Sequence, residues 1–120
     1  MITSPYINLL QKTMDVAWLR QQVISNNIAN VNTPGYKRRE VKFEELLAES
    51  LKQRDGVIEK LPDAEVVTVN DTTIKEDGNN VDIDKEYIEQ YRTQTQYEYL
   101  SRSIADEFLK LRLVLTEGRG

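Results

Sequence analysis

The chain has 120 residues, of which 39% are hydrophobic and 30% charged, and its formal net charge at pH 7 is −4. This length corresponds to one domain, and the composition supports a modest core. The sequence contains no cysteine and no histidine, which excludes disulfides, Cys/His zinc sites and imidazole bases.

Charge is distributed unevenly along the sequence. Residues 1–39 contain five basic groups and one acidic group, residues 40–90 contain six and fifteen, and residues 91–120 contain five and four. The middle of the chain is therefore acidic, and the pI is about 4.9. An acidic chain of this kind is not expected to bind nucleic acid. Apolar runs of four residues or fewer also predict no membrane insertion.

The first predicted element is a helix over residues 1–31, with its periodic part beginning after Ser4-Pro5. Ser4 fits the N-cap and Pro5 the first helical position. Because Thr33-Pro34-Gly35 cannot continue a helix, the element should end near Asn30. Its apolar stripe, interrupted by the polar Gln21, is typical of an amphipathic helix and contains Ile7, Leu10, Met14, Ala17, Ile24, Ile28 and Val31.

Little regular structure is predicted for residues 32–83. Residues 43–51 fit a short helix, since their apolar side chains share one face. Residues 57–58 and 65–69 are β-prone, and a turn at Asn70-Asp71 would pair 65–69 with residues 72–75 in one small hairpin. Such a hairpin is marginal unless it packs against another element.

A second long helix is predicted over residues 84–117, with Asp84 as its N-cap and Gly118 as its stop. Polar residues at 92–96 interrupt its apolar face, which is formed by Tyr97, Leu100, Ile104, Phe108, Leu111 and Leu115. The two helices could form an antiparallel core or a coiled coil, either within the chain or between chains. We therefore expect a mainly α fold in which long terminal helices pair as a coiled coil around a small irregular or hairpin segment.

Catalytic and cofactor sites have no support in the sequence. A calcium loop starting at Asp77 would need an oxygen ligand at its fifth position, glycine at its sixth and glutamate at its twelfth. Those positions hold Val81, Asp82 and Ile88. The five glycines are scattered and form no phosphate-binding loop. No enzymatic activity, metal or cofactor is expected.

Four asparagines, Asn26, Asn27, Asn30 and Asn32, lie at the end of the first helix. Asparagine side chains compete with helical hydrogen bonds and favour caps and turns. Two interpretations stay open here. The side chains could form a polar ladder that pairs with a specific neighbour, or the helix end could be frayed and capped locally.

Two blocks of sequence make the chain recognisable. Residues 26–38 read Asn-Asn-Ile-Ala-Asn-Val-Asn-Thr-Pro-Gly-Tyr-Lys-Arg, and residues 77–86 read Asp-Gly-Asn-Asn-Val-Asp-Ile-Asp-Lys-Glu. The first block resembles the signature of bacterial flagellar axial proteins, which form the rod, the hook and the hook-associated structures. The second resembles a block in the short proximal-rod proteins. The closing stretch 108–118 is similar to the B-type family among these, and not to the C-type.

The resemblance implies a non-enzymatic subunit of the proximal rod that assembles itself and transmits motor torque. It also implies export through the flagellar type III apparatus without a cleaved signal, in keeping with a start that lacks a basic stretch before an apolar one. The implied place is the periplasmic rod of the basal body. Implied partners are other rod proteins, the adaptor between the MS-ring and the rod, and the export gate. The whole chain, 1–120, would be one axial unit.

The resemblance and the residues together predict an assembly surface. Aromatic and arginine side chains favour interface cores. The basic turn, which consists of Tyr36, Lys37, Arg38 and Arg39, is therefore expected to contact an acidic surface of a neighbouring subunit, at Asp82, Asp84 or Glu86. A solvated basic turn is the other interpretation. The full set of candidate assembly residues is Asn26, Asn27, Asn30, Asn32, Pro34, Gly35, Tyr36, Lys37, Arg38, Arg39, Asn79, Asn80, Asp82 and Asp84. An alternative function is a soluble helical adaptor or chaperone for flagellar type III export.

Overall fold

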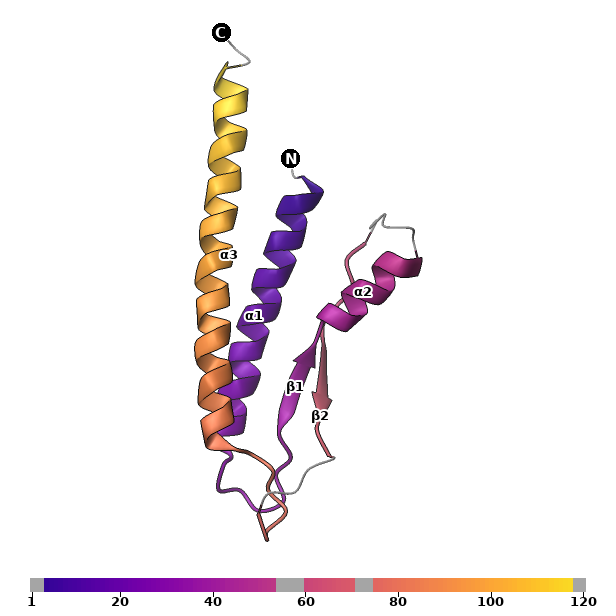
Figure 1. Cartoon of the computed structure of the whole chain (residues 1–120), viewed down its shortest axis with the longest axis vertical. Helices are drawn as coiled ribbons and strands as arrows, with labels where there is room; N and C mark the ends of the chain where they lie inside the picture. Colours follow the sequence, from indigo (N-terminus) through magenta and orange to yellow (C-terminus); the bar gives the residue numbers. More distant parts are fainter. Residues whose placement is uncertain (1–3, 54–59, 71–74, 118–120) are drawn as a thin grey trace.

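The computed structural model describes residues 4–53, 60–70 and 75–117. Two long helices lie side by side, and a small sheet and a short helix lie next to them (Figure 1). The elements are α1 (Pro5–Ala29), β1 (Arg39–Lys42), α2 (Glu44–Gln53), β2 (Glu65–Thr68) and α3 (Ile83–Glu117). This arrangement confirms the predicted mainly α fold, with paired terminal helices and a small antiparallel sheet between them in sequence.

The ends of α1 follow the local signals in the sequence. The Ser4 hydroxyl accepts a hydrogen bond from the Ile7 amide at 3.1 Å, and Pro5 occupies the first turn. The helix ends at Ala29, with Asn30 as its C-cap. Both predicted boundaries are confirmed.

The two long helices pack along most of α1 but not along all of α3. Buried apolar residues on α1 include Ile7, Leu10 and Ile24, and α3 contributes Leu100. The remaining predicted pairing residues Met14, Ile28, Tyr97, Ile104 and Leu111 are half-buried. Phe108 and Leu115 are 43% and 49% exposed, so residues 4–53, 60–70 and 75–117 leave the distal end of the predicted pairing face partly uncovered.

The length difference between the helices accounts for this exposure. α3 has 35 residues and α1 has 25, so at 1.5 Å per residue α3 is longer by about 15 Å. Figure 1 shows the C-terminal end of α3 extending past the first turn of α1. No helix in the described part of the chain is long and apolar enough to cross a membrane.

The small sheet contains a strand that the sequence did not predict. β1 and β2 are antiparallel, with Val41 opposite Val66, so residues 65–68 pair with 39–42. Residues 57–58 and 72–74 lie outside the described residues, so the hairpin of 65–69 with 72–75 stays a prediction. β1 was missed because it is short and mostly charged. The sheet packs on α1 through a buried cluster of Val16, Val23, Val41 and Phe43.

The start of α3 corrects a second prediction. Its first residue is Ile83, and the Asp82 carboxylate accepts hydrogen bonds from the amides of Asp84 and Lys85 at 3.1 and 3.4 Å. This is N-cap geometry, so the capping residue is Asp82 and not Asp84. The polar run 92–96 is helical, and Thr93 within it is buried.

Candidate functional site

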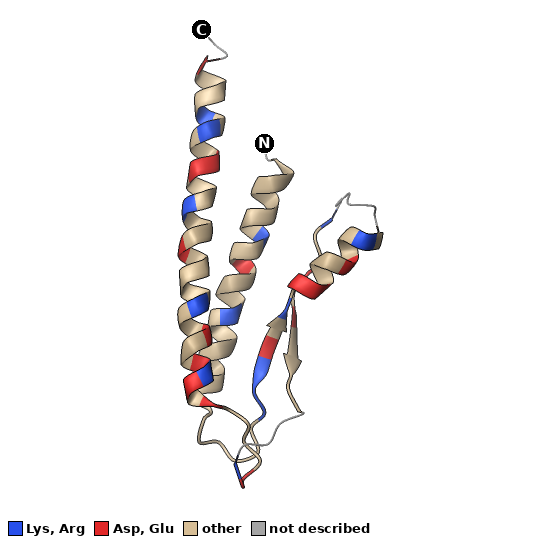
Figure 2. Ribbon diagram, in the orientation of Figure 1, with Lys and Arg blue, Asp and Glu red and all other residues tan. Residues whose placement is uncertain are grey.

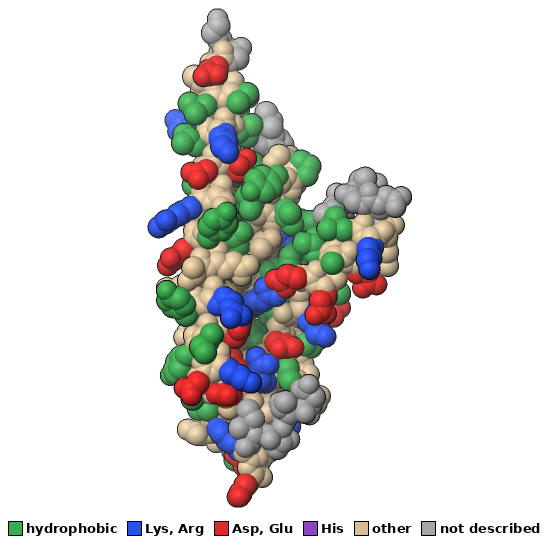
Figure 3. All heavy atoms as spheres, viewed as in Figure 1, with side chains coloured by type: hydrophobic (Ala, Val, Ile, Leu, Met, Phe, Trp, Pro, Cys, Tyr) green, Lys and Arg blue, Asp and Glu red, His purple; other side chains and the backbone are tan. Residues whose placement is uncertain are grey.

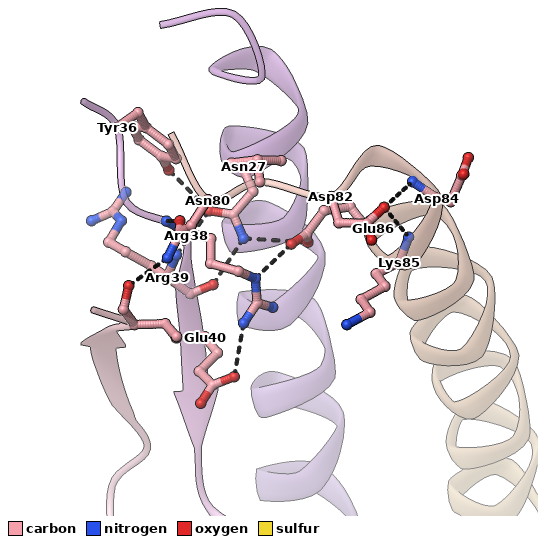
Figure 4. A network of polar contacts seen from close by, with 12 residues as sticks. Asn27, Tyr36, Arg38, Arg39, Glu40, Asn80, Asp82, Asp84, Lys85 and Glu86 are labelled. Carbon is pink, nitrogen blue, oxygen red and sulfur yellow. Dashed lines mark hydrogen bonds and ion pairs between the residues drawn. The ribbon is translucent and has the colours of Figure 1, made fainter. Parts of the chain in front are cut away.

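The two recognisable blocks of sequence meet at one end of the molecule. The end of α1, the turn that follows it and the segment before α3 converge there (Figure 1). We call this region the junction and define it by Asn27, Tyr36, Arg38, Asn79, Asn80 and Glu86. Figure 4 shows most of these side chains pointing toward one another from three separate segments.

Asn27 is the centre of the junction. Its side chain is fully buried. Its Oδ1 accepts hydrogen bonds from the Tyr36 hydroxyl and the Arg39 amide, both at 2.9 Å. Its Nδ2 donates to the Arg39 carbonyl at 2.8 Å and to Glu86 Oε2 at 3.3 Å. One amide therefore uses its full bonding capacity to join α1, β1 and α3.

A buried ion pair lies beside Asn27. The Glu86 side chain is 1% exposed, and its Oε1 accepts from Arg38 Nε at 2.8 Å. Arg38 also donates to the more exposed Glu40 at 3.1 Å. Burial works against the charge of Arg38, but the bonds to Glu86 and Glu40 outweigh it and raise the arginine pKa. The guanidinium therefore neutralises a carboxylate that would be costly to bury alone.

Asn79 and Asn80 attach the second block to the first. Asn79 Nδ2 donates to the carbonyls of Asn30 and Thr33, both at 2.9 Å, and thereby caps the end of α1. Asn80 Oδ1 accepts from the Arg38 amide at 2.6 Å, and its Nδ2 donates to the Val69 carbonyl at 2.7 Å. Both side chains are fully buried.

Two glycines let the blocks approach closely. Gly35 and Gly78 have φ angles of +73° and +86°, a region that residues with a Cβ rarely adopt. The Gly35 amide donates to the Asp77 carbonyl at 2.9 Å. The Lys37 ammonium donates to the Gly78 carbonyl.

The structure changes the interpretation of several predicted residues. The side chain of the C-cap residue Asn30 donates to the carbonyl and the side chain of Asn26 in the last turn of α1, which agrees with local capping. Asn27 forms neither a polar ladder to a neighbour nor a local cap, because all four of its hydrogen bonds join it to distant residues of the same chain. One expected acidic partner of the basic turn, Glu86, binds Arg38 of the same chain. The contact of the turn with a neighbouring subunit stays a prediction, with Asp82 and Asp84 as its remaining acidic candidates. Of the other candidates, Asn32, Pro34 and Asp84 are exposed.

Glu86 is the junction residue whose burial sequence reasoning missed. A signal for it exists in the spacing of the inner face of α3. Glu86, Thr93 and Leu100 are the buried residues of α3, and steps of seven place all three on one side of the helix. A charged residue on a buried helical row indicates a buried partner.

The chemistry of the junction is that of a structural tie. In the described ranges, every buried side-chain nitrogen and oxygen atom has a hydrogen-bond partner. Satisfied polar networks in a low-dielectric interior fix one arrangement of the segments that they join. The junction therefore sets the positions of α1, the sheet and α3 relative to one another.

The opposite end of the molecule is apolar and open. We call Phe108, Leu111 and Leu115 the overhang, because they continue the inner face of α3 past the end of α1. A shallow pocket lies between these three side chains, Arg112 and Thr116. Figure 3 shows hydrophobic side chains gathered on this part of α3.

Comparison with known proteins gives the junction and the overhang a context. A family model described as "Flagella basal body rod protein" matches residues 8–37. The flagellar basal body rod protein FlgB of Bacillus subtilis is 33% identical over 122 residues, covering 94% of this chain and 95% of that protein. The chain belongs to the FlgB family. FlgB of Borreliella burgdorferi is 32% identical and FlgB of Buchnera aphidicola 29% identical, over 91% and 90% of this chain.

Membership of the FlgB family makes the chain a structural component of the flagellar basal body rod, associated with other rod components. The family model covers most of α1 and the turn after it, which supply Asn27 and Tyr36. The remaining junction residues, Arg38, Asn79, Asn80 and Glu86, lie outside the matched segment. The structure thus connects the matched segment to a distant part of the chain.

Proposed function

We propose that this FlgB-family chain is a non-catalytic subunit of the proximal rod that assembles through its terminal helices and transmits motor torque. The observation that carries the proposal is the overhang. Phe108 and Leu115 remain 43% and 49% exposed on the same helix face that α1 covers further along. An apolar helix face of this kind is stabilised by burial against another chain.

The proposal includes a place and partners. The resemblance supports a position in the periplasmic rod, reached through the flagellar type III apparatus without a cleaved signal. It also supports contacts with the adaptor between the MS-ring and the rod, and with the export gate. The rigid junction suits torque transmission, because a buried, fully bonded network resists changes in the angle between the elements that it joins.

A gene deletion with complementation tests this function. The deletion strain should be non-motile and its isolated basal bodies should lack the rod. Wild-type protein should restore both, whereas Phe108→Ser/Leu115→Ser should restore neither. Gln22→Ser, at an exposed position of α1 outside the candidate assembly residues, is the control and should restore motility. Complete rods in the deletion strain would overturn the proposal.

A groove favours a second candidate function, a soluble helical adaptor or chaperone for flagellar export. It has a volume of about 1250 Å³ and runs between α3 and β1, with Val23 and Ile24 of α1 among its lining residues. Its rim is charged, with Arg20 bound to Glu44 and Arg92 to Glu89. Figure 2 shows basic and acidic residues around this part of the molecule. Intact rods together with failed export of one rod protein in the deletion strain would favour this candidate.

A further inference from the structure

A second row of apolar side chains follows α3 on the side away from its buried residues Glu86, Thr93 and Leu100. Two of its members, Ile88 and Tyr99, line the edge of the groove between α3 and β1. We call this row the outer stripe. Its members are between 54% and 75% exposed and are Tyr87, Ile88, Tyr91, Tyr99, Leu109 and Leu113. Figure 3 shows hydrophobic side chains at intervals along the whole of α3, including its outer edge.

Helix geometry places the outer stripe opposite the buried row of α3. Tyr91 and Leu109 are eighteen residues apart, which is five whole turns at 3.6 residues per turn, so they point in the same direction. The buried residues Thr93 and Leu100 lie on the other side of the helix, at about 100° per residue. The overhang continues that buried side. One helix therefore presents two uncovered apolar surfaces that face in opposite directions.

This opposition restricts the symmetry of a contact between copies. A two-fold contact brings the same patch of each copy together, so it would cover either the overhang or the outer stripe and leave the other exposed. A contact between the overhang of one copy and the outer stripe of the next covers both surfaces with a single kind of interface. We propose that neighbouring copies in the rod make this overhang-to-stripe contact.

The chemistry of the two surfaces is complementary. The overhang presents Phe108, Leu111 and Leu115 at i, i+3 and i+7, the spacing of anchors in helix-in-groove recognition. Arg112 lies beside them in the same pocket. The side of α3 that carries the outer stripe also carries the exposed acids Asp84, Glu98 and Asp106, which outnumber the exposed Arg102 on that side. A cation next to the anchors can therefore meet carboxylates or tyrosine rings on the stripe.

The contact has a consequence for assembly. Each copy uses one surface for the preceding neighbour and the other surface for the following one, so the contact propagates instead of closing as a dimer. This inference rests on the proposed rod function and specifies which surfaces carry it.

The absence of cysteine from the sequence allows a clean crosslinking test in assembled basal bodies. Leu115→Cys marks the overhang, and Ile88→Cys, Tyr99→Cys and Leu109→Cys mark three levels of the outer stripe. Chains that combine Leu115→Cys with one stripe cysteine would be treated with a short bismaleimide in basal bodies isolated from motile cells. We expect at least one pair to give a ladder of crosslinked trimers and larger species, whereas each single variant gives none above the Gln22→Cys control.

The outcomes separate the alternatives. Dimers from Tyr99→Cys alone would indicate a two-fold contact and overturn the inference. Crosslinks to a different protein would show that another partner covers the surface and would also overturn it. If no pair crosslinks above the control, the contact does not exist.

None of these results would contradict the rod function itself, which fails only if complete rods form in the deletion strain. If the cysteine chains do not support motility, the same crosslinking of purified full-length protein at high concentration decides between a ladder and a dimer.

Discussion

The junction and the overhang occupy opposite ends of the molecule and differ in an unexpected way. At the junction, side chains that usually prefer water are buried: Asn27, Asn79, Asn80 and Glu86 are each 1% exposed or less. At the overhang, side chains that usually prefer a core are about half exposed. The difference shows that hydrogen-bond partners, more than residue type, determine which side chains are buried within a single chain.

A buried amide or carboxylate is stable when each of its polar atoms is paired, and it becomes destabilising when one partner is lost. The junction meets this condition within one chain. Apolar side chains do not need specific partners, because burial against any surface that removes them from water lowers the free energy. The junction should therefore determine the stability of the monomer, and the overhang should determine its association.

The largest effect on stability is expected from Asn27→Ala. The substitution leaves the Tyr36 hydroxyl, both backbone groups of Arg39 and one oxygen of Glu86 without their partner. Unpaired buried groups cost about 1–3 kcal/mol each, partly relieved by water, so the free energy of unfolding should fall by about 3–5 kcal/mol. Urea denaturation measures it. Asn32→Ala is the matched control and should change stability by less than about 0.5 kcal/mol; equal losses in both variants would contradict the account.

The Arg38–Glu86 pair should give the next largest effect. Glu86→Ala should lower stability by about 2–3 kcal/mol, because Arg38 then loses its buried partner. Glu40 binds the same guanidinium but its side chain is 46% exposed, so Glu40→Ala should cost less than about 1 kcal/mol. A double-mutant cycle with Arg38→Met should therefore show stronger coupling to Glu86 than to Glu40. Equal coupling energies would show that burial does not distinguish the two carboxylates.

Gly78→Ala should have a smaller effect that arises from the backbone. At a φ of +86°, a Cβ costs about 1–2 kcal/mol. The added Cβ would lie 3.6 Å from the Gly35 Cα, which is ordinary contact, so no clash adds to this cost. Thermal unfolding of Gly78→Ala and Gly35→Ala should show similar shifts. A loss above about 3 kcal/mol in Gly78→Ala would indicate that the two blocks cannot adjust around it.

The smallest effect on monomer stability is expected at the overhang. Phe108→Ser/Leu115→Ser should change the free energy of unfolding by less than about 1 kcal/mol, since both side chains are already about half exposed. The same variant should prevent rod assembly. Denaturation of the monomer and electron microscopy of basal bodies measure the two properties separately. A large loss of monomer stability with normal assembly would reverse the assignment of the two ends.

The sequence predicts those parts of the fold that depend on local signals. The stripe at Ile7, Leu10 and Ile24 predicts α1, and Ser4, Pro5 and Asn30 predict its ends within a residue. The start of α3 is less certain, because Asp82 and Asp84 both fit an N-cap and their side-chain bonds distinguish them only in three dimensions.

The partners of the junction residues depend on contacts between segments far apart in sequence. Asn27, Arg38 and Glu86 are polar residues in three separate segments. The spacing of Glu86 with Thr93 and Leu100 indicates its burial, but nothing local shows that the three side chains meet. The same holds for the strand at 39–42, whose partner is 65–68. The Asn-rich block identifies the region correctly. Only the structure shows that Asn27 joins three segments of its own chain.

Amide hydrogen exchange on the purified monomer tests the central claim most directly. The account predicts slow exchange near Asn27, at 79–81 and in the first half of α3, because the junction holds these segments together. It predicts fast exchange at 108–117, where α3 extends past α1 and no other described element packs on it. Uniform protection along α3 in a proven monomer, or fast exchange at the junction with protection at the distal end, would contradict it.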